Sequence, residues 1–185
     1  TGAMLLIDEA HAVGVCGPEG RGLAAHLHGC DNVVTLVTCG KALGCEGALI
    51  LAPTVFRDFL VNRGRSFIFS TAPSPLIAAI VRESLSIVAG ADDRRERLRQ
   101  IIEHAHGRLA PLGIPPSGTH IQPVPIGEDS RTMRIAEALQ ARGFDIRGIR
   151  PPTVPAGTAR LRISLTLNID EAEISEFATA LEDLL

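Results

Sequence analysis

The sequence predicts an α/β protein with a second, smaller α+β domain. The first half alternates short apolar runs with Gly-rich turns, which is typical of central strands of a parallel sheet covered on both faces. These runs are Ala3–Ile7, Val33–Val37 and Ala48–Leu51. The composition changes near Gly90, where a charged amphipathic helix begins at Asp92-Asp93. We therefore expect two domains, residues 1–90 and residues 91–185.

Each remaining element follows from a local pattern. Phe67–Ser70 is a fourth short strand candidate, and Pro73-Ser74-Pro75 introduces a helix over about Leu76–Ala89. The second domain is expected to continue after its charged helix with a strand, a helix, a strand pair and a closing helix, at His120–Ile126, Arg131–Arg142, Ile146–Ile149 with Leu161–Leu165, and Asp170–Leu185.

Composition and charge argue against several classes of function. Of 185 residues, 45% are hydrophobic and 21% are charged, which is a globular composition, and the formal net charge is −3. An acidic chain without Trp or Tyr lacks the basic surface and most of the stacking side chains of nucleic-acid-binding proteins. No apolar run approaches the ~20 residues of a membrane-spanning helix. We therefore predict neither a nucleic-acid nor a membrane partner.

The cysteines and histidines predict a reducing compartment and no metal site. Four cysteines show no CxxC pairing and no regular framework, which favours a cytoplasmic protein. His26-x-His28 and His104-x-His106 have a spacing that could chelate a metal, but no third ligand is near either pair.

An acidic motif follows the first apolar run. Asp8-Glu9-Ala10-His11 places an acid at the end of a strand, where ligand sites of parallel sheets lie. In one interpretation the motif is the acid box of a helicase-type ATPase, which holds Mg²⁺. In another, Asp8 pairs with a pyridinium nitrogen and His11 donates to a neighbouring oxygen. An acid that merely caps the next turn is the structural alternative.

The only lysine of the chain, Lys41, follows the second apolar run, and every other cation is Arg. Lysine can offer a neutral primary amine near neutral pH, whereas arginine cannot. In Thr38-Cys39-Gly40-Lys41 the hydroxyl could hold a phosphate while the amine reaches a carbonyl carbon. The motif is not a P-loop, because Ala42 follows the lysine. A surface lysine without a chemical role is the structural alternative. Because Lys41 is the only lysine of the chain, we favour a chemical role.

Four motifs in this order resemble a known family. Asp8-Glu9-Ala10-His11, Thr38-x-x-Lys41, residues 67–71 and the segment 150–162 look like the pyridoxal-phosphate-dependent α-oxoamine synthases. The resemblance covers essentially the whole chain, and the last motif is the most specific. It implies that residues 1–90 are the C-terminal part of the large cofactor-binding domain of a fold-type I transferase, and that residues 91–185 are its small C-terminal domain.

The resemblance implies roles at the cofactor, pyridoxal 5′-phosphate. Lys41 would bind it covalently through the amine and later move the Cα proton of the substrate. Asp8 would pair with the pyridinium nitrogen, and His11 would hydrogen-bond the phenolic oxygen of the ring. Thr38 would hold the phosphate.

Further roles are implied for the partner subunit and the substrate. Ser70 and Thr71 match a segment that reaches the phosphate of the neighbouring subunit's site in a homodimer. Arg162 would clamp the carboxylate of the amino acid, for which a bidentate guanidinium is suited. Thr153 matches a substrate-contacting position, and Arg150 is a further carboxylate candidate.

The implied reaction is a decarboxylating condensation of L-alanine with a pimeloyl thioester, carried on coenzyme A or a carrier protein, to give 8-amino-7-oxononanoate for biotin synthesis. Three alternatives stay open. These are a relative that uses glycine or serine, a helicase-like ATPase fragment, and a non-catalytic fragment. The ATPase interpretation also expects a basic face and a later Arg-rich motif, and the sequence contains neither.

The chain is expected to be incomplete. Thr1 is not methionine, and Met4–Ile7 read as a strand entered in mid-domain. The family's ring-stacking His, Gly-rich phosphate loop and N-terminal substrate segment do not occur in this chain, so it would carry part of a site and be inactive alone. Ala12 and Glu46 also depart from the residues usual in the family.

Overall fold

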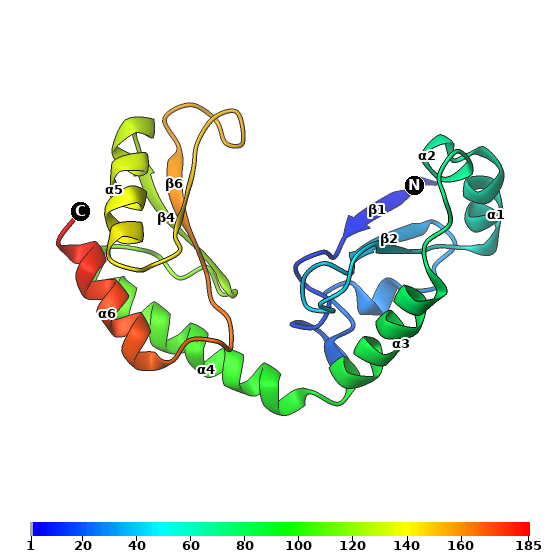
Figure 1. Cartoon of the computed structure of the whole chain (residues 1–185), viewed down its shortest axis with the longest axis horizontal. Coiled ribbons are helices and arrows are strands. Elements are labelled where there is room, and N and C mark those ends of the chain that lie inside the picture. Colours follow the sequence, from blue (N-terminus) through cyan, green and yellow to red (C-terminus); the bar gives the residue numbers. More distant parts are fainter. Residues whose placement is uncertain (1) are drawn as a thin grey trace. The chain divides into compact units, whose positions relative to one another are not determined.

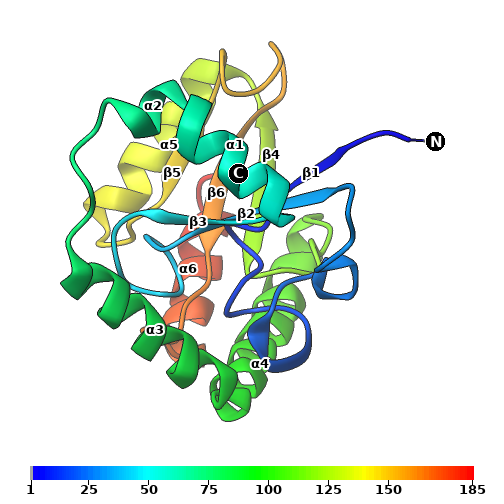
Figure 2. The same cartoon turned by 90° about the vertical axis from the view of Figure 1, so that its right-hand side faces the viewer.

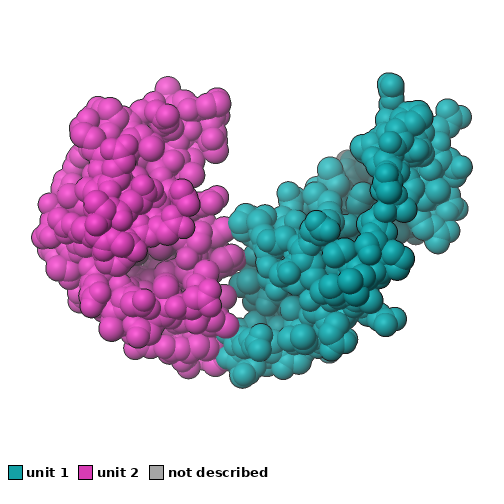
Figure 3. All heavy atoms as spheres, in the orientation of Figure 1, with its two compact units in different colours: residues 1–95 teal, residues 96–185 magenta. Residues whose placement is uncertain are grey.

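The computed structural model describes residues 2–185, and Thr1 lies outside them. The chain divides into two compact units, of which the first ends at Arg95 and the second is Glu96–Leu185 (Figure 3). Each unit contains a three-stranded sheet with helices, so the predicted combination of α/β and α+β structure is observed.

The sheet of the first unit has the order β1-β2-β3 (Figure 1). β1 (Leu5–Asp8) is parallel to β2 (Val33–Thr38), and β3 (Ala48–Leu51) is antiparallel to β2. Burial alternates along β2, as expected for the middle strand. β1 is parallel as predicted, whereas β3 is not. The prediction that both are strands covered on both faces is wrong, because both are edge strands whose side chains are mostly exposed.

The helices of the first unit follow β3. They are α1 (Thr54–Arg63), which the sequence analysis missed, α2 (Arg65–Ile68) and α3 (Pro75–Ala89). The strand expected at Phe67–Ser70 is wrong. The Phe67 and Ile68 N–H groups donate to Gly64 O at 2.8 and 2.9 Å, so local helical bonds satisfy backbone that a strand would pair with a neighbour. α3 begins as its sequence indicates, since Ser74 caps it by accepting from Leu76 N–H at 3.2 Å.

Two short 3₁₀ turns, Pro18–Gly20 and Ala25–Leu27, lie in the long connection between β1 and β2. Figure 2 shows this connection in blue and α3 in green. A small cluster of buried side chains joins the loops after β1 and β2 to α3: Val13, Val37, Cys39, Leu43 and Val81.

The second unit has the sheet order β4-β6-β5, and all its pairs are antiparallel. Its elements are α4 (Asp92–Leu109), which begins just before the boundary, the 3₁₀ turn Ala110–Leu112, β4 (Ile121–Gly127), α5 (Asp129–Ala141), β5 (Arg147–Ile149), β6 (Ala159–Ser164) and α6 (Glu171–Glu182). Every strand and helix expected in this half is present, with ends shifted by a few residues.

Helical periodicity explains how α5 covers the sheet. Its buried residues Thr132, Ile135, Ala136 and Leu139 follow the spacing of one helix face. α5 comes so close to β5 that a Cβ on Gly148 would lie 2.8 Å from the Met133 sulfur. α6 is fixed at its start by a capping box between Asp170 and Glu173. The helices and sheet enclose one continuous apolar core.

Candidate active site

Two predicted site residues end neighbouring parallel strands. Asp8 is the last residue of β1 and pairs in register with Leu36 of β2, so Thr38, the last residue of β2, lies two positions further along. Both side chains are therefore placed at the carboxyl edge of the β1-β2 pair, where ligand sites of parallel sheets are found. Asp8 is exposed, and its Oδ1 accepts from Ala10 N–H at 2.9 Å, which fixes the carboxylate at the start of the following turn.

Lys41 projects from a tightly closed loop after β2. Cys39 N–H donates to Gly47 O at 2.9 Å, Cys45 N–H to Cys39 O at 2.8 Å, and Gly44 N–H to Lys41 O at 3.0 Å. Lys41 itself is exposed, between an interior Cys39 and an interior Leu43. The loop thus holds its interior residues in the core cluster and presents the lysine outward. Gly40 N–H approaches Thr38 Oγ1 at 3.5 Å.

A direct contact joins the loops after β1 and β2. Gly14 has a φ of +87°, and a Cβ built on it would lie only 2.5 Å from the Ala42 Cβ. Only a residue without a side chain allows this approach. The loop that begins with Asp8 and His11 is therefore packed against the residue next to Lys41. His11 is exposed in the turn that follows β1.

Glu9 is an important residue of this region that sequence reasoning missed. Its side chain is only 2% exposed, and its carboxylate accepts from the N–H groups of Leu23, at 3.2 Å, and Ala24. A helicase-type ATPase needs this carboxylate available to the nucleotide site, whereas here it is turned inward and hydrogen-bonded to backbone. The sequence signal was the Asp8-Glu9 pair, since neighbouring acids after a strand point to different sides.

Burial changes the acidity of two thiols near the loops. Burial raises the pKa of the Cys39 thiol, and the nearby Cys45 thiol adds to the rise. Burial also raises the pKa of the Cys16 thiol, with the Glu9 carboxylate as a second cause. Both thiols are therefore kept protonated at neutral pH, which fits packing better than nucleophilic chemistry. All four cysteines are free.

Ser70 and Thr71 lie beyond α2, away from these loops along the chain. Both are exposed, and the Ser70 hydroxyl donates to Ser66 O at 2.6 Å. Within residues 2–185, no hydrogen bond or ion pair joins either residue to Asp8, Thr38 or Lys41.

The three predicted substrate residues belong to the second unit. Arg150 and Thr153 are exposed in the connection between β5 and β6, where Thr153 N–H donates to Arg150 O at 3.0 Å. Arg162 is exposed on β6, between the fully buried Leu161 and the buried Ile163, and faces Arg147 of β5 in register. Arg147 is paired with Asp145 at 2.9 Å, whereas the described residues offer no carboxylate partner to Arg162.

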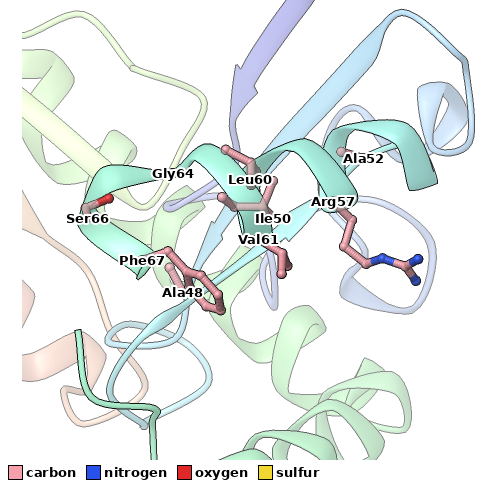
Figure 4. A pocket seen from close by; sticks show the side chains of 9 residues that line it. All are labelled: Ala48, Ile50, Ala52, Arg57, Leu60, Val61, Gly64, Ser66 and Phe67. Carbon is pink, nitrogen blue, oxygen red and sulfur yellow. The ribbon is translucent and has the colours of Figure 1, made fainter. Parts of the chain in front are cut away.

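Two pockets lie outside the edge that carries Asp8 and Lys41. One of about 380 Å³ lies between β3 and α1–α2, and its lining is mostly apolar. Figure 4 shows the Arg57 guanidinium turned away from the other labelled side chains, and it pairs with Asp58 at 2.8 Å. A second cavity, of about 590 Å³, lies in the second unit, with Arg147 and Arg162 at its wall.

No three His, Cys, Asp or Glu side chains among residues 2–185 are grouped as metal ligands. None of the helices in this range has the length and apolar character needed to cross a membrane.

A family profile, described as aminotransferase class I and II, matches residues 1–181. The chain belongs to this family. The 8-amino-7-oxononanoate synthase of Burkholderia thailandensis is 44% identical over 185 residues, which cover 97% of this chain and 47% of that protein. The synthase of the same name from Anaeromyxobacter dehalogenans is 43% identical over 187 residues, covering 100% of this chain and 47% of that protein. The chain thus spans about half the length of these curated relatives.

Solved structures show the same fold. A serine palmitoyltransferase from Sphingomonas wittichii matches with a TM-score of 0.87 at 25% identity, covering 99% of this chain and 47% of that one. A structure of SPT with PLP matches with a TM-score of 0.87 at 28% identity and the same coverage. The 8-amino-7-oxononanoate synthase of Francisella tularensis matches with a TM-score of 0.84 at 24% identity, covering 97% of this chain and 54% of that one. The predicted fold class, part of a fold-type I transferase, is confirmed.

Proposed function

We propose that this chain is part of a pyridoxal-phosphate-dependent α-oxoamine synthase and carries the lysine that binds the cofactor. The observation that carries the proposal is the placement of the only lysine. Lys41 is exposed on the loop after β2, at the sheet edge where Asp8 ends β1, and the two loops touch through Gly14 and Ala42. The sequence similarity to curated synthases and the fold match to SPT with PLP support it.

The residues present fit this cofactor. An exposed carboxylate, a hydroxyl and a primary amine come from one sheet edge, and each complements one part of the molecule. Asp8 would hold the ring nitrogen, His11 the phenolic oxygen and Thr38 the phosphate. Asp8 Oδ1 accepts from Ala10 N–H, so the turn itself orients the carboxylate. Ser70 and Thr71 would complete the phosphate site of a neighbouring subunit in a homodimer.

The cofactor, when bound, supplies an electron sink for negative charge at the Cα atom of an amino acid. The protein supplies the rest. The Asp8 carboxylate would hold the ring nitrogen in its protonated form, and the Lys41 amine would move the proton at the Cα atom of the substrate. The Arg162 guanidinium would hold the substrate carboxylate through two parallel hydrogen bonds. Thr153 and Arg150, in the β5–β6 connection, would contact the substrate beside it.

For the whole protein we propose condensation of L-alanine with a pimeloyl thioester, with loss of carbon dioxide, to give 8-amino-7-oxononanoate. The support is the identity of 43–44% over essentially the whole chain to curated synthases of that name. The glycine- or serine-using alternative is therefore less favoured. The four free cysteines support a cytoplasmic setting.

Reductive trapping tests the cofactor assignment directly. The 185-residue chain is incubated with pyridoxal 5′-phosphate, reduced with borohydride and mapped by mass spectrometry. We expect a stoichiometric adduct on Lys41 and none at that position in Lys41→Arg, which keeps the charge but has no primary amine. Saturable ATP binding without a Lys41 adduct would instead support the ATPase interpretation. Folded protein with neither would support a non-catalytic fragment.

A further inference from the structure

Glu9 has no part in the proposed chemistry, yet it is held in an unusual way. Among residues 2–185 it is the only buried acidic side chain. A buried carboxylate is unfavourable unless hydrogen bonds compensate for the lost water. Here no cation pairs with it within the described part of the chain, and the compensating donors are two consecutive backbone N–H groups, those of Leu23 and Ala24. The carboxylate therefore ties the start of the connection between β1 and β2 to a segment fourteen and fifteen residues further along the chain.

The backbone beside the carboxylate also leaves room for it. Gly22 has a φ of +102°, and a Cβ there would lie 2.9–3.1 Å from the carboxylate atoms of Glu9. The backbone of Glu9 is anchored as well, since its N–H donates to Leu36 O at 2.9 Å and its carbonyl accepts from Ala12 and Val13. Glu9 thus connects β2, the turn after Asp8, and the segment that begins at Gly22.

From Gly22 a series of contacts leads to the lysine loop. Gly22 N–H donates to Cys16 O at 2.9 Å, which closes the intervening turn, and Gly14 N–H donates to Gly20 O at 2.7 Å. Gly14 in turn packs against Ala42, the residue after Lys41. Fixing Leu23 and Ala24 therefore fixes the surface on which the Lys41 loop rests.

We infer that Glu9 is a positioning residue: its carboxylate holds residues 10–24 in the conformation that supports the Lys41 loop through Gly14. The function of the positioned loop rests on the proposed cofactor binding, but the positioning itself does not. Glu9 touches no reacting atom. Replacing Glu9 would therefore loosen the Lys41 loop without removing any of the proposed cofactor-binding residues Asp8, His11 and Lys41.

Amide hydrogen exchange of the cofactor-free chain tests the positioning. In the wild type, the Leu23 and Ala24 amides are expected to be protected although they lie in an irregular connection. Glu9→Gln leaves one acceptor and faces an amide NH₂ toward a backbone donor, so we expect about tenfold faster exchange at these two amides. Gly44 and Cys45, which close the Lys41 loop, should also exchange faster. Unprotected wild-type amides, or an unchanged Lys41 loop, would overturn the inference.

Glu19→Gln is the matched control, because Glu19 is an exposed acid in the same connection and the chemical change is identical. It should leave all four amides unchanged. If Glu9→Gln does not fold, Gly14→Ala tests the same coupling from its other end, since the new methyl group clashes with Ala42. Faster exchange at Gly44 and Cys45 with Leu23 and Ala24 still protected would support the inference, and an unchanged lysine loop would refute it.

The cofactor experiment separates this inference from the proposed function. The concentration of pyridoxal 5′-phosphate that gives half-maximal trapping on Lys41 should rise about tenfold in Glu9→Gln and stay constant in Glu19→Gln. Equal values in the two variants would contradict a positioning role. If the wild type forms no adduct, the proposed function fails, and the exchange data alone still decide whether Glu9 supports the loop.

Discussion

Similar apolar sequences are buried to different extents in the two units of the chain. In the second unit, the apolar faces of helices and strands meet, and Leu139, Leu161 and Leu181 are fully buried. In the first, β1, β3 and α1 carry apolar side chains that remain exposed, such as Leu6, which is 75% exposed. Packing in the first unit is concentrated where the loops after β1 and β2 meet α3.

This difference shows which contacts stabilise each unit. The second unit is stabilised by a continuous core between sheet and helices, as an ordinary small domain is. The first is best packed around the loops that carry Asp8 and Lys41, whereas its sheet edges and α1 present apolar surface of the kind that marks interaction sites. The predictions below test this contrast, from the largest expected effect to the smallest.

The largest effect is expected from a core truncation. Leu161→Ala removes a fully buried side chain from the middle strand of the second sheet and should lower the free energy of unfolding by about 3 kcal/mol, because it removes apolar burial and leaves a cavity. Leu6→Ala, the same change on exposed β1, should cost less than about 0.5 kcal/mol. Denaturant unfolding followed by circular dichroism measures both. Equal costs would contradict the contrast between the units.

Helix capping should be similar in the two units, since it is a local interaction. Asp170→Ala removes one half of the capping box of α6 and should cost about 1 kcal/mol. Ser74→Ala removes the single capping bond of α3, and about 0.5–1 kcal/mol is expected. Thermal unfolding of both variants checks the values. A cost at Ser74 well above that at Asp170 would mean that α3 stabilises the first unit more than its packing indicates.

The sequence predicts the second unit better than the first for a physical reason. Elements such as α5 and α6 bury one regular face within the unit, so periodicity and caps report their true environment. In the first unit the apolar runs of β1 and β3 indicate coverage that the described residues do not provide. Phe67–Ser70 has a strand-like composition, but its first two residues are the last two of α2. Their N–H groups bond locally, to Gly64 O.

The sequence predicts the positions of the candidate site residues but not the contacts that support them. The unusual chemistry of Asp8, Thr38 and Lys41 stands out in the sequence, and the parallel β1-β2 pair brings their positions to one edge. The roles of those residues stay a prediction. The Asp8-Glu9 pair indicates only that the two acids point to different sides. It does not show that Gly14 packs on Ala42 or that Glu9 binds Leu23 and Ala24, because such contacts depend on how a long connection folds back.

The smallest expected effect concerns alkaline pH and belongs to the first unit alone, because all four cysteines lie there. Burial raises the pKa of Cys39 in the folded state, so the thiol stays protonated when the unfolded thiol, with a pKa of about 8.5, ionises. Ionisation of the unfolded thiol therefore does not affect stability below about pH 8. Above that, it lowers the free energy of unfolding progressively as the pH rises toward about 10.

Unfolding measured between pH 8 and pH 10 isolates this contribution. Cys39→Ala should lose stability less steeply with rising pH over this interval than the wild type does, whatever its cost at pH 8. Cys30→Ala is the matched control, since Cys30 is exposed and its removal should leave the pH dependence unchanged. An equal slope in Cys39→Ala and the wild type would show that the interior beside Lys41 admits water, and the first unit would then lack even the local core that its loops share.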